Sequence, residues 1–155
     1  MNMYSSLYTS PIGLLEIKAN ENAILNINLV KDKTNKCENE NVIINKCKQE
    51  LDEYFSKKRK TFDIPIKYTG TDFQNKVWMK ICEIKYGTEL SYKDLAKKIG
   101  RETAIRAVAN AVGKNKILIL IPCHRILGAN KSLTGFSAGI ENKKYLLDLE
   151  GIEYV

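Results

Sequence analysis

The sequence predicts an α+β protein with a small α/β part, residues 1–66, followed by a mainly helical part, residues 67–155. In the first part, apolar residues alternate with polar ones, as they do in half-buried strands. In the second part, they recur every three or four residues, as they do on the buried face of a helix. Because each part is long enough for a small core of its own, we expect two domains.

Positive charge is concentrated in the second part. The chain carries 25 Lys and Arg against 18 Asp and Glu, a formal net charge of +7. Residues 1–66 hold 10 basic and 9 acidic side chains, whereas residues 67–155 hold 15 and 9. This asymmetry indicates either a polyanionic partner for the second part or a solubilising surface, and charge alone does not separate the two.

The composition is that of an ordinary globular protein. Hydrophobic residues make up 44% and charged residues 28% of the 155 positions. The longest apolar run, residues 117–121, falls far short of the ~20 residues that a membrane span needs. The sequence does not open with a basic segment followed by an apolar one, as a secretion signal does. We therefore expect a cytoplasmic protein with no membrane partner.

The cysteines and the histidine do not form a metal-binding pattern. The four cysteines are Cys37, Cys47, Cys82 and Cys123, and there is one histidine. No two cysteines have the spacing of a zinc knuckle, so we expect no metal, and nothing in the sequence indicates a cofactor. Cys82 lies in an apolar helical pattern and is interpreted as a small core residue. Cys37 and Cys47 are assigned no function.

Strands and one helix are predicted in the first part. Leu25, Ile27 and Leu29 alternate with asparagines, which predicts a strand. Residues 62–68 alternate in the same way, and Pro65 among them favours an edge strand. Between these segments, apolar residues recur at helical spacing over residues 43–55, which predicts one long helix.

Two capping boxes predict helix starts in the second part. They are Thr71-x-x-Gln74 and Ser91-x-x-Asp94, each followed by an apolar stripe at helical spacing. Gly100 predicts the end of the second of these helices. A third helix follows at once, and two short helices joined by a tight turn that contains glycine are typical of a helix-turn-helix.

The third helix, from about Thr103, has one apolar and one polar side. The predicted apolar stripe is Ile105, Val108, Ala109 and Val112. The outer side carries Thr103, Arg106, Ala107, Asn110 and Lys114. Small side chains at Ala107 and Ala111 would let the backbone approach a DNA groove, while Arg106 and Lys114 would meet phosphates or Arg106 would enter the base stack. The alternative is a plain solvent-facing helix.

A potential nucleophile follows that helix. Residues 117–121 predict a buried strand or extended segment, and Pro122 ends it with a turn. Cys123 is therefore expected where the chain leaves the core, directly before His124. A thiol attacks only as the thiolate, which a neighbouring imidazole or cation favours.

A carboxylate should orient the imidazole, as in other nucleophilic triads. The C-terminal candidates are Glu141, Asp148, Glu150 and Glu153. The alternative interpretation of this pair is a buried cysteine beside a histidine that caps a turn.

The residues around Cys123 also carry a family resemblance. Residues 121–125, Ile-Pro-Cys-His-Arg, closely resemble the active-site signature of the O6-alkylguanine-DNA alkyltransferases. Further similar segments are residues 86–92, residues 106–111, Asn115, residues 133–139 and residues 149–151. The resemblance covers about residues 71–151 and implies a winged-helix-like helix-turn-helix there. Residues 1–66 resemble that family's ribonuclease-H-like domain in layout.

The resemblance implies a DNA repair reaction. A monomer without cofactor would move an alkyl group, irreversibly and once, from O6 of guanine or O4 of thymine in double-stranded DNA to Cys123. His124 would act through a water as the base, and Glu150 would orient His124. Asn115 would hold the turn around the site, and Tyr92 would donate a proton to N3 of guanine.

The resemblance also implies how alkylated DNA is held. The damaged base has to be flipped out of the duplex, and Arg106 would fill the space that it leaves. The recognition helix would enter the minor groove. Other implied DNA contacts are Ala107, Asn110, Lys114, Arg125 and Ser137. Lys143, as a helper, and Phe136 are further candidate site residues.

Four positions depart from the family pattern. Lys116 follows Asn115 where the family has proline, which is expected to loosen the turn or to add a phosphate contact. Phe136 lacks the hydroxyl of the commoner tyrosine, and Lys131 stands where glycine is common. Ala138 replaces a glycine in the base-binding loop, so bulky alkyl groups are expected to be accepted differently.

Three other functions fit parts of the pattern. A damage sensor without catalysis would lack the cysteine, so Cys123 argues against it. A helix-turn-helix regulator with a redox cysteine would need to dimerise on half-sites, and the sequence shows no spare helix for this. A hydrolytic cysteine enzyme would turn over, whereas an alkylated thioether is not regenerated by hydrolysis.

Overall fold

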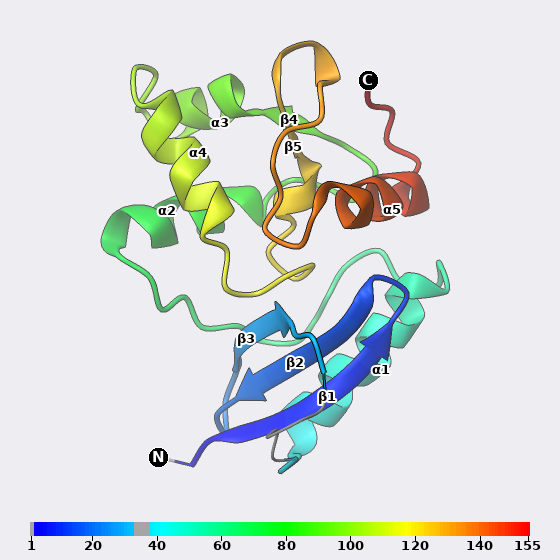
Figure 1. Cartoon of the computed structure of the whole chain (residues 1–155). Helices are drawn as coiled ribbons and strands as arrows, with labels where there is room; N and C mark the ends of the chain where they lie inside the picture. Colours follow the sequence, from blue (N-terminus) through cyan, green and yellow to red (C-terminus); the bar gives the residue numbers. More distant parts are fainter. Residues whose placement is uncertain (1, 33–37) are drawn as a thin grey trace. The chain divides into compact units, whose positions relative to one another are not determined.

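The computed structural model describes residues 2–32 and 38–155 and divides the chain into two compact units, Met1–Tyr68 and Thr69–Val155 (Figure 1). Cys37 lies outside the described residues. The first unit is a sheet with one helix, and the second is mainly helical. The predicted α+β class is therefore confirmed.

The first unit is a three-stranded antiparallel sheet covered by a helix (Figure 1). The strands are β1 (Tyr4–Ser10), β2 (Gly13–Ala19) and β3 (Ile24–Leu29), in that order across the sheet, and the helix is α1 (Val42–Phe55). Leu15 and Ile17 of β2 are fully buried, as are Leu51 and Tyr54 of α1. An amphipathic helix on one sheet face thus gives this unit its core.

Two strand predictions in this unit need correction. In β3, a bulge shifts the pairing with β2 between Lys18 and Ala19, so the buried residues are Ile24 and Ile27 and not a strict alternation. Leu29, predicted to share a face with Leu25 and Ile27, is 38% exposed. Residues 62–68 form no strand, and Ile66 makes one isolated parallel bridge to Ile24. Pro65 explains this, since it has no N–H to continue a ladder.

The second unit places four helices around a very short parallel sheet. The helices are α2 (Asp72–Ile81), α3 (Tyr92–Lys98), α4 (Ile105–Gly113) and α5 (Ile140–Glu150). The strands β4 (Leu90–Ser91) and β5 (Ile126–Leu127) pair in parallel, and two single turns, η1 (Cys123–Arg125) and η2 (Ala129–Lys131), flank β5. Trp78 of α2 is buried, and its indole N–H donates to the carbonyl of Ala111 at 2.9 Å.

The caps of α2 and α3 lie where the sequence predicts them. Thr71 and Gln74 form a complete capping box, and the Ser91 hydroxyl accepts from the backbone N–H of Asp94. Gly100 has φ +74° and closes α3, with backbone N–H groups of Gly100 and Arg101 donating to Lys97 and Ala96. These two bonds are a Schellman motif, which turns the chain sharply from α3 into α4.

The buried stripe of α4 differs from the predicted one. Val108, Ala111 and Val112 are buried, whereas Ile105 is 38% exposed. Ala111 therefore packs in the core. The prediction that it would help the backbone to approach a DNA groove is wrong. Ile105 begins the helix, and at that end its side chain forms part of a cavity wall.

Residues 117–121 form tight turns, which corrects the predicted strand or extended segment. The backbone N–H of Leu120 donates to Leu118, and that of Ile121 to Ile117. Ile119 has φ +73°, which is rare for a β-branched residue and stores local strain just before Cys123. All five side chains are nevertheless buried, because the turns are folded into the core.

A matched pair of glycine substitutions tests the helix-turn-helix turn. At Gly100 and Gly113, an added Cβ would meet no atom within 4 Å, so the backbone conformation decides the outcome. We expect Gly100→Ala to destabilise the protein by about 1 kcal/mol, because alanine is strained at positive φ. Gly113→Ala, in the last turn of α4, should stabilise by up to about 1 kcal/mol. Chemical denaturation measures the change in unfolding free energy for both variants. Changes of the same sign would contradict this description of the turn.

Candidate active site

Cys123 opens the single turn η1 and is 2% exposed. Burial raises the pKa of its thiol, and nearby Cys82 adds to this rise. Lys143 and a hydrogen bond from Asn115 act in the opposite direction and lower it. The resting thiol is therefore protonated, and the groups that favour the thiolate are already in place.

The Asn115 side chain fastens the turn that precedes Cys123. Its Nδ2 donates to the carbonyl of Ile121 at 2.9 Å, and its Oδ1 accepts from the N–H of Ile117 at 2.9 Å. Both bonds are buried, so they hold the two ends of the 117–121 turns together. Lys116, the position where proline was expected, is instead tied to the carbonyl of Thr69 at 3.1 Å.

A buried network joins Glu150, the last residue of α5, to the turn that carries Cys123. His124 Nε2 and Glu150 Oε2 lie 2.6 Å apart, and both side chains are fully buried. Arg125 donates from Nε to Oε1 of Glu150 at 2.8 Å and from Nη2 to Oε2 at 3.0 Å. The N–H of Gly87 also donates to Oε1 at 3.2 Å. Such a bidentate, charge-assisted arrangement is among the strongest that proteins make.

The charges of this network follow from its geometry. Burial disfavours the carboxylate of Glu150, but the bonds from His124 and Arg125 outweigh it and lower its pKa to about 2. Burial lowers the pKa of His124, against the raising effect of Glu150. The pair therefore consists of a carboxylate and a neutral imidazole whose Nε2–H donates to Glu150.

The other ring nitrogen of His124 is then an acceptor. Within the described part of the chain, Nδ1 is buried and has no hydrogen-bond partner. Buried polar atoms are nearly always paired, and the exceptions often have a catalytic role. An unprotonated Nδ1 on the residue next to Cys123 can take up a proton.

Lys143 of α5 is a buried cation near the sulfur. It is 1% exposed, and its Nζ donates to the carbonyl of Ile126 at 2.7 Å. Burial lowers its pKa to about 8, while the charge on Cys123 acts to raise it. The ammonium group would gain most from a thiolate at Cys123, because the two charges would share a medium of low polarity.

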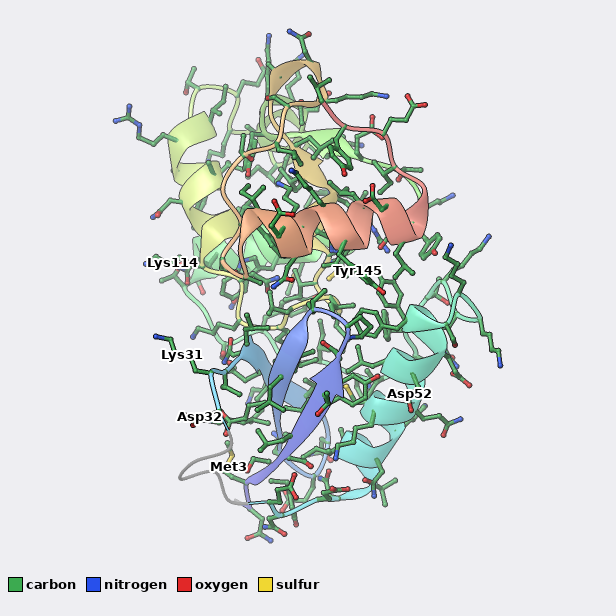
Figure 2. The ribbon with its side chains drawn as sticks, turned by 45° about the vertical axis from the view of Figure 1, so that its right-hand side comes forward. Met3, Lys31, Asp32, Asp52, Lys114 and Tyr145 are labelled. Atoms are coloured by element: carbon green, nitrogen blue, oxygen red, sulfur yellow. The ribbon has the colours of Figure 1, made fainter. Side chains whose placement is uncertain are left out.

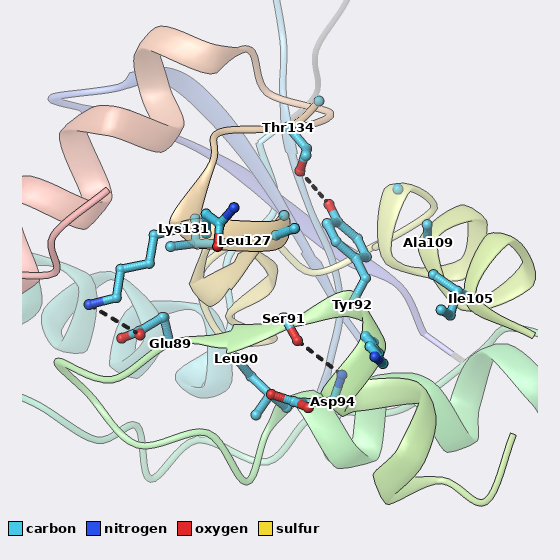
Figure 3. A pocket seen from close by; sticks show the side chains of 16 residues that line it. Glu89, Leu90, Ser91, Tyr92, Asp94, Ile105, Ala109, Leu127, Lys131 and Thr134 are labelled. Atoms are coloured by element: carbon cyan, nitrogen blue, oxygen red, sulfur yellow. Dashed lines mark hydrogen bonds and ion pairs between the residues drawn. The ribbon is translucent and has the colours of Figure 1, made fainter. Parts of the chain in front are cut away.

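A cavity of about 1090 Å³ opens beside the helix-turn-helix (Figure 3). Its walls come from residues 89–94, from one side of α4, and from residues 127–131, 134 and 135. The Tyr92 hydroxyl lies in this cavity, 2.8 Å from the hydroxyl of Thr134. Burial raises the pKa of Tyr92, its hydrogen bond with Thr134 lowers it, and the charge of Cys123 raises it.

The predicted DNA-contacting side of α4 is open to solvent. Thr103, Arg106, Ala107, Asn110 and Lys114 are all exposed. Lys114 lies directly after the last turn of α4 (Figure 2). Ser137 is exposed and Phe136 is half-buried, and both belong to the loop before α5.

Arg125 requires a correction. It was predicted to contact DNA, but it is 6% exposed, bound to Glu150, and also donates to the carbonyl of Ile84 at 2.7 Å. Its guanidinium group also faces the ring of Tyr86 at 5.8 Å. Arg125 therefore braces Glu150 within the protein. The acidic candidates Glu141, Asp148 and Glu153 are exposed, which leaves Glu150 as the partner of His124.

Sequence reasoning missed Thr134 and the double contact of Arg125 with Glu150. Thr134 was noted within a motif but given no role. Both contacts join residues 25 or more positions apart, so no local sequence pattern predicts them. There was one weak signal for the Arg125 contact in the sequence: Arg125 directly follows His124, for which an acidic partner was expected.

Membrane-spanning helices and metal sites are absent from the described residues. No helix in them is long and apolar enough to cross a membrane. In the same residues, no three His, Cys, Asp or Glu side chains are grouped so that they could hold a metal ion.

Two family models match the chain. Residues 72–152 match the DNA-binding domain of 6-O-methylguanine DNA methyltransferase, and residues 3–68 match the ribonuclease-like domain of the same family.

Individual relatives agree with these matches. A methylated-DNA–protein-cysteine methyltransferase of Methanosarcina barkeri is 39% identical over 96% of this chain and 97% of its own length. The inducible enzyme of that name from Bacillus subtilis is 50% identical over 65% of this chain, which spans 56% of that relative. The Mycobacterium tuberculosis OGT crystallised with DNA has a TM-score of 0.84 and 35% identity, covering 93% of this chain and 90% of that one. The chain belongs to the 6-O-methylguanine DNA methyltransferase family.

Proposed function

We propose that this protein repairs alkylated double-stranded DNA by moving an alkyl group from O6 of guanine onto Cys123, once per molecule. The observation that carries the proposal is the buried Glu150–His124 pair, which leaves an unpartnered acceptor nitrogen on the residue that follows the buried Cys123. The names of the relatives support the reaction class. The exposed basic side of α4 supports DNA as the partner.

The thiol proton is the first to move. Glu150 holds His124 with Nε2–H toward the carboxylate, so Nδ1 accepts the proton of Cys123, with one water between them. The buried ammonium group of Lys143 stabilises the thiolate that results. Burial keeps this anion poorly solvated, and therefore strongly nucleophilic.

The thiolate then attacks the alkyl carbon in line with the C–O6 bond. The S–C bond forms while the C–O6 bond breaks, and its electron pair goes to guanine. Tyr92 gives its proton to N3 of the departing base, and the proton on His124 returns to the phenolate afterwards. Guanine is restored, and Cys123 remains as a thioether that nothing in the site can cleave, so each molecule acts once. The same attack applies to O4 of alkylated thymine.

The base has to leave the duplex to reach Cys123, since its O6 is otherwise inside the stack. The cavity beside Tyr92 is large enough to receive it. The small, exposed side chain of Ala107 on α4 allows close approach to a narrow groove, and Arg106 takes the place of the flipped nucleotide. Asn110 and Lys114 hold the backbone, and Ser137 contacts the base.

Mass spectrometry of the reacted protein tests the proposal. After mixing with a duplex that contains O6-methylguanine, we expect a gain of one methylene on the peptide that contains Cys123, at no more than one per molecule. Cys82→Ala should react like the wild type. Cys123→Ala should bind the duplex without any gain in mass. Multiple turnovers, or methylation of Cys82 in the wild type, would contradict the proposal.

A comparison of substrates tests the role of Arg106. We expect Arg106→Ala to slow transfer from duplex DNA at least tenfold, because the gap left by the flipped base costs several kcal/mol of stacking and pairing. On single-stranded DNA the same change should have little effect. Lys114→Ala is the control, since loss of a phosphate contact weakens binding to both substrates and reduces its salt dependence. Equal losses on both substrates for Arg106→Ala would argue against the role.

The Glu150→Gln variant tests the buried network. We expect it to lose activity and about 3–5 kcal/mol of stability, because Arg125 would keep a buried charge without its partner. Glu153→Gln, at an exposed position, should change little.

The pH dependence of unfolding provides a second test of the buried network. Since the pKa of Glu150 is lowered from 4.5 to about 2, its contribution is present above pH 4.5 and is lost as the pH falls through 2. The free energy of unfolding of the wild type should fall by about 3 kcal/mol more than that of Glu150→Gln over this window. Parallel pH profiles would show that Glu150 is not held as a buried carboxylate.

A further inference from the structure

The hydrogen bond between Tyr92 and Thr134 joins two residues that line the cavity (Figure 3). Tyr92 is the first residue of α3, and Thr134 lies in the loop between β5 and α5. The two oxygens are 2.8 Å apart, and either could be the donor. Which of them donates decides what Tyr92 can do for a bound base.

The packing of Thr134 fixes where its hydroxyl points. An added Cβ on Gly128 would come within 2.9 Å of the Thr134 methyl group, so the missing side chain at Gly128 makes room for that methyl. The N–H of Gly128 also donates to the carbonyl of Ser132 at 2.8 Å, which closes the loop below Thr134. With its methyl group seated on one side, Thr134 directs its oxygen to Tyr92.

The Tyr92 hydroxyl needs a partner that can donate to it. A phenol that gives up its proton in a half-buried site becomes a poorly solvated anion, and this slows proton transfer. A hydroxyl that donates to the phenol oxygen stabilises that anion and leaves the phenol proton free for the base. Thr134 can do both. If Tyr92 donated to Thr134 instead, its only proton would be engaged.

We propose that Thr134 is a positioning residue for Tyr92. The Thr134 hydroxyl donates to the phenol oxygen of Tyr92 and thereby aims the phenol proton at the bound base. This inference rests on the proposed function. The proton that moves is the one on Tyr92, which passes to N3 of guanine. The proton of Thr134 stays on Thr134, and its hydrogen bond to the phenol oxygen strengthens as negative charge develops there.

Substitutions of Thr134 test the inference. Thr134→Val keeps the shape and removes the hydroxyl, while Thr134→Ser keeps the hydroxyl and loses the methyl. The rate of methyl transfer in a single turnover is measured at saturating duplex, and DNA affinity and melting temperature are measured separately. We expect the valine variant to be roughly tenfold to hundredfold slower with unchanged affinity, as for a lost hydrogen bond to a charged group. The serine variant should be close to wild type.

A double-mutant cycle separates this role from a structural one. In a Tyr92→Phe background, Thr134→Val should cause no further loss, because the residue acts through the phenol oxygen. An undiminished loss in that background would overturn the inference, as would a valine variant at the wild-type rate or a serine variant as slow as valine. A wild type that transfers no methyl group would overturn the proposed function, and this inference with it. A wild-type rate for the valine variant would overturn this inference alone.

Discussion

The buried carboxylate of Glu150 is the constraint on which the rest of the site depends. It accepts hydrogen bonds from His124, Arg125 and the backbone of Gly87, and so ties the end of α5 to the η1 turn and to the segment before β4. A buried carboxylate is stable only when it is fully paired, and here each of its oxygens receives at least two bonds. The same bonds fix the tautomer of His124, so one interaction serves both the fold and the chemistry.

The sulfur of Cys123 is held in a state that is stable at rest and ready to react. Burial raises the pKa of its thiol, which protects the thiol from other electrophiles. Lys143 and Asn115 lower that pKa, and in the proposed reaction the acceptor nitrogen of His124 takes up the thiol proton. The strained turn at Ile119 lies just before Cys123 and positions it. The hydrogen bonds of Asn115 with Ile117 and Ile121 keep that turn closed.

Local chemistry was predictable from the sequence, and long-range contacts were not. The capping box at Thr71 and the glycine turn at Gly100 depend on neighbours within a few residues, and both were predicted correctly. The apolar run 117–121 was predicted to be extended because burial and backbone conformation cannot be separated by hydropathy. Arg125 looked like a DNA contact because its partner, Glu150, lies 25 residues away. The hydrogen bond between Tyr92 and Thr134 was not predictable either, because these residues also lie far apart in the sequence.

The tautomer of His124 is the most direct test of the account, and the chain has just one histidine, so its signals are unambiguous. Nitrogen NMR of protein labelled at histidine should show, near neutral pH, a protonated Nε2 and an unprotonated Nδ1. That result would leave Nδ1 able to take the proton of Cys123. A ring protonated on Nδ1, or on both nitrogens, would contradict the account, because His124 could not then act as the base.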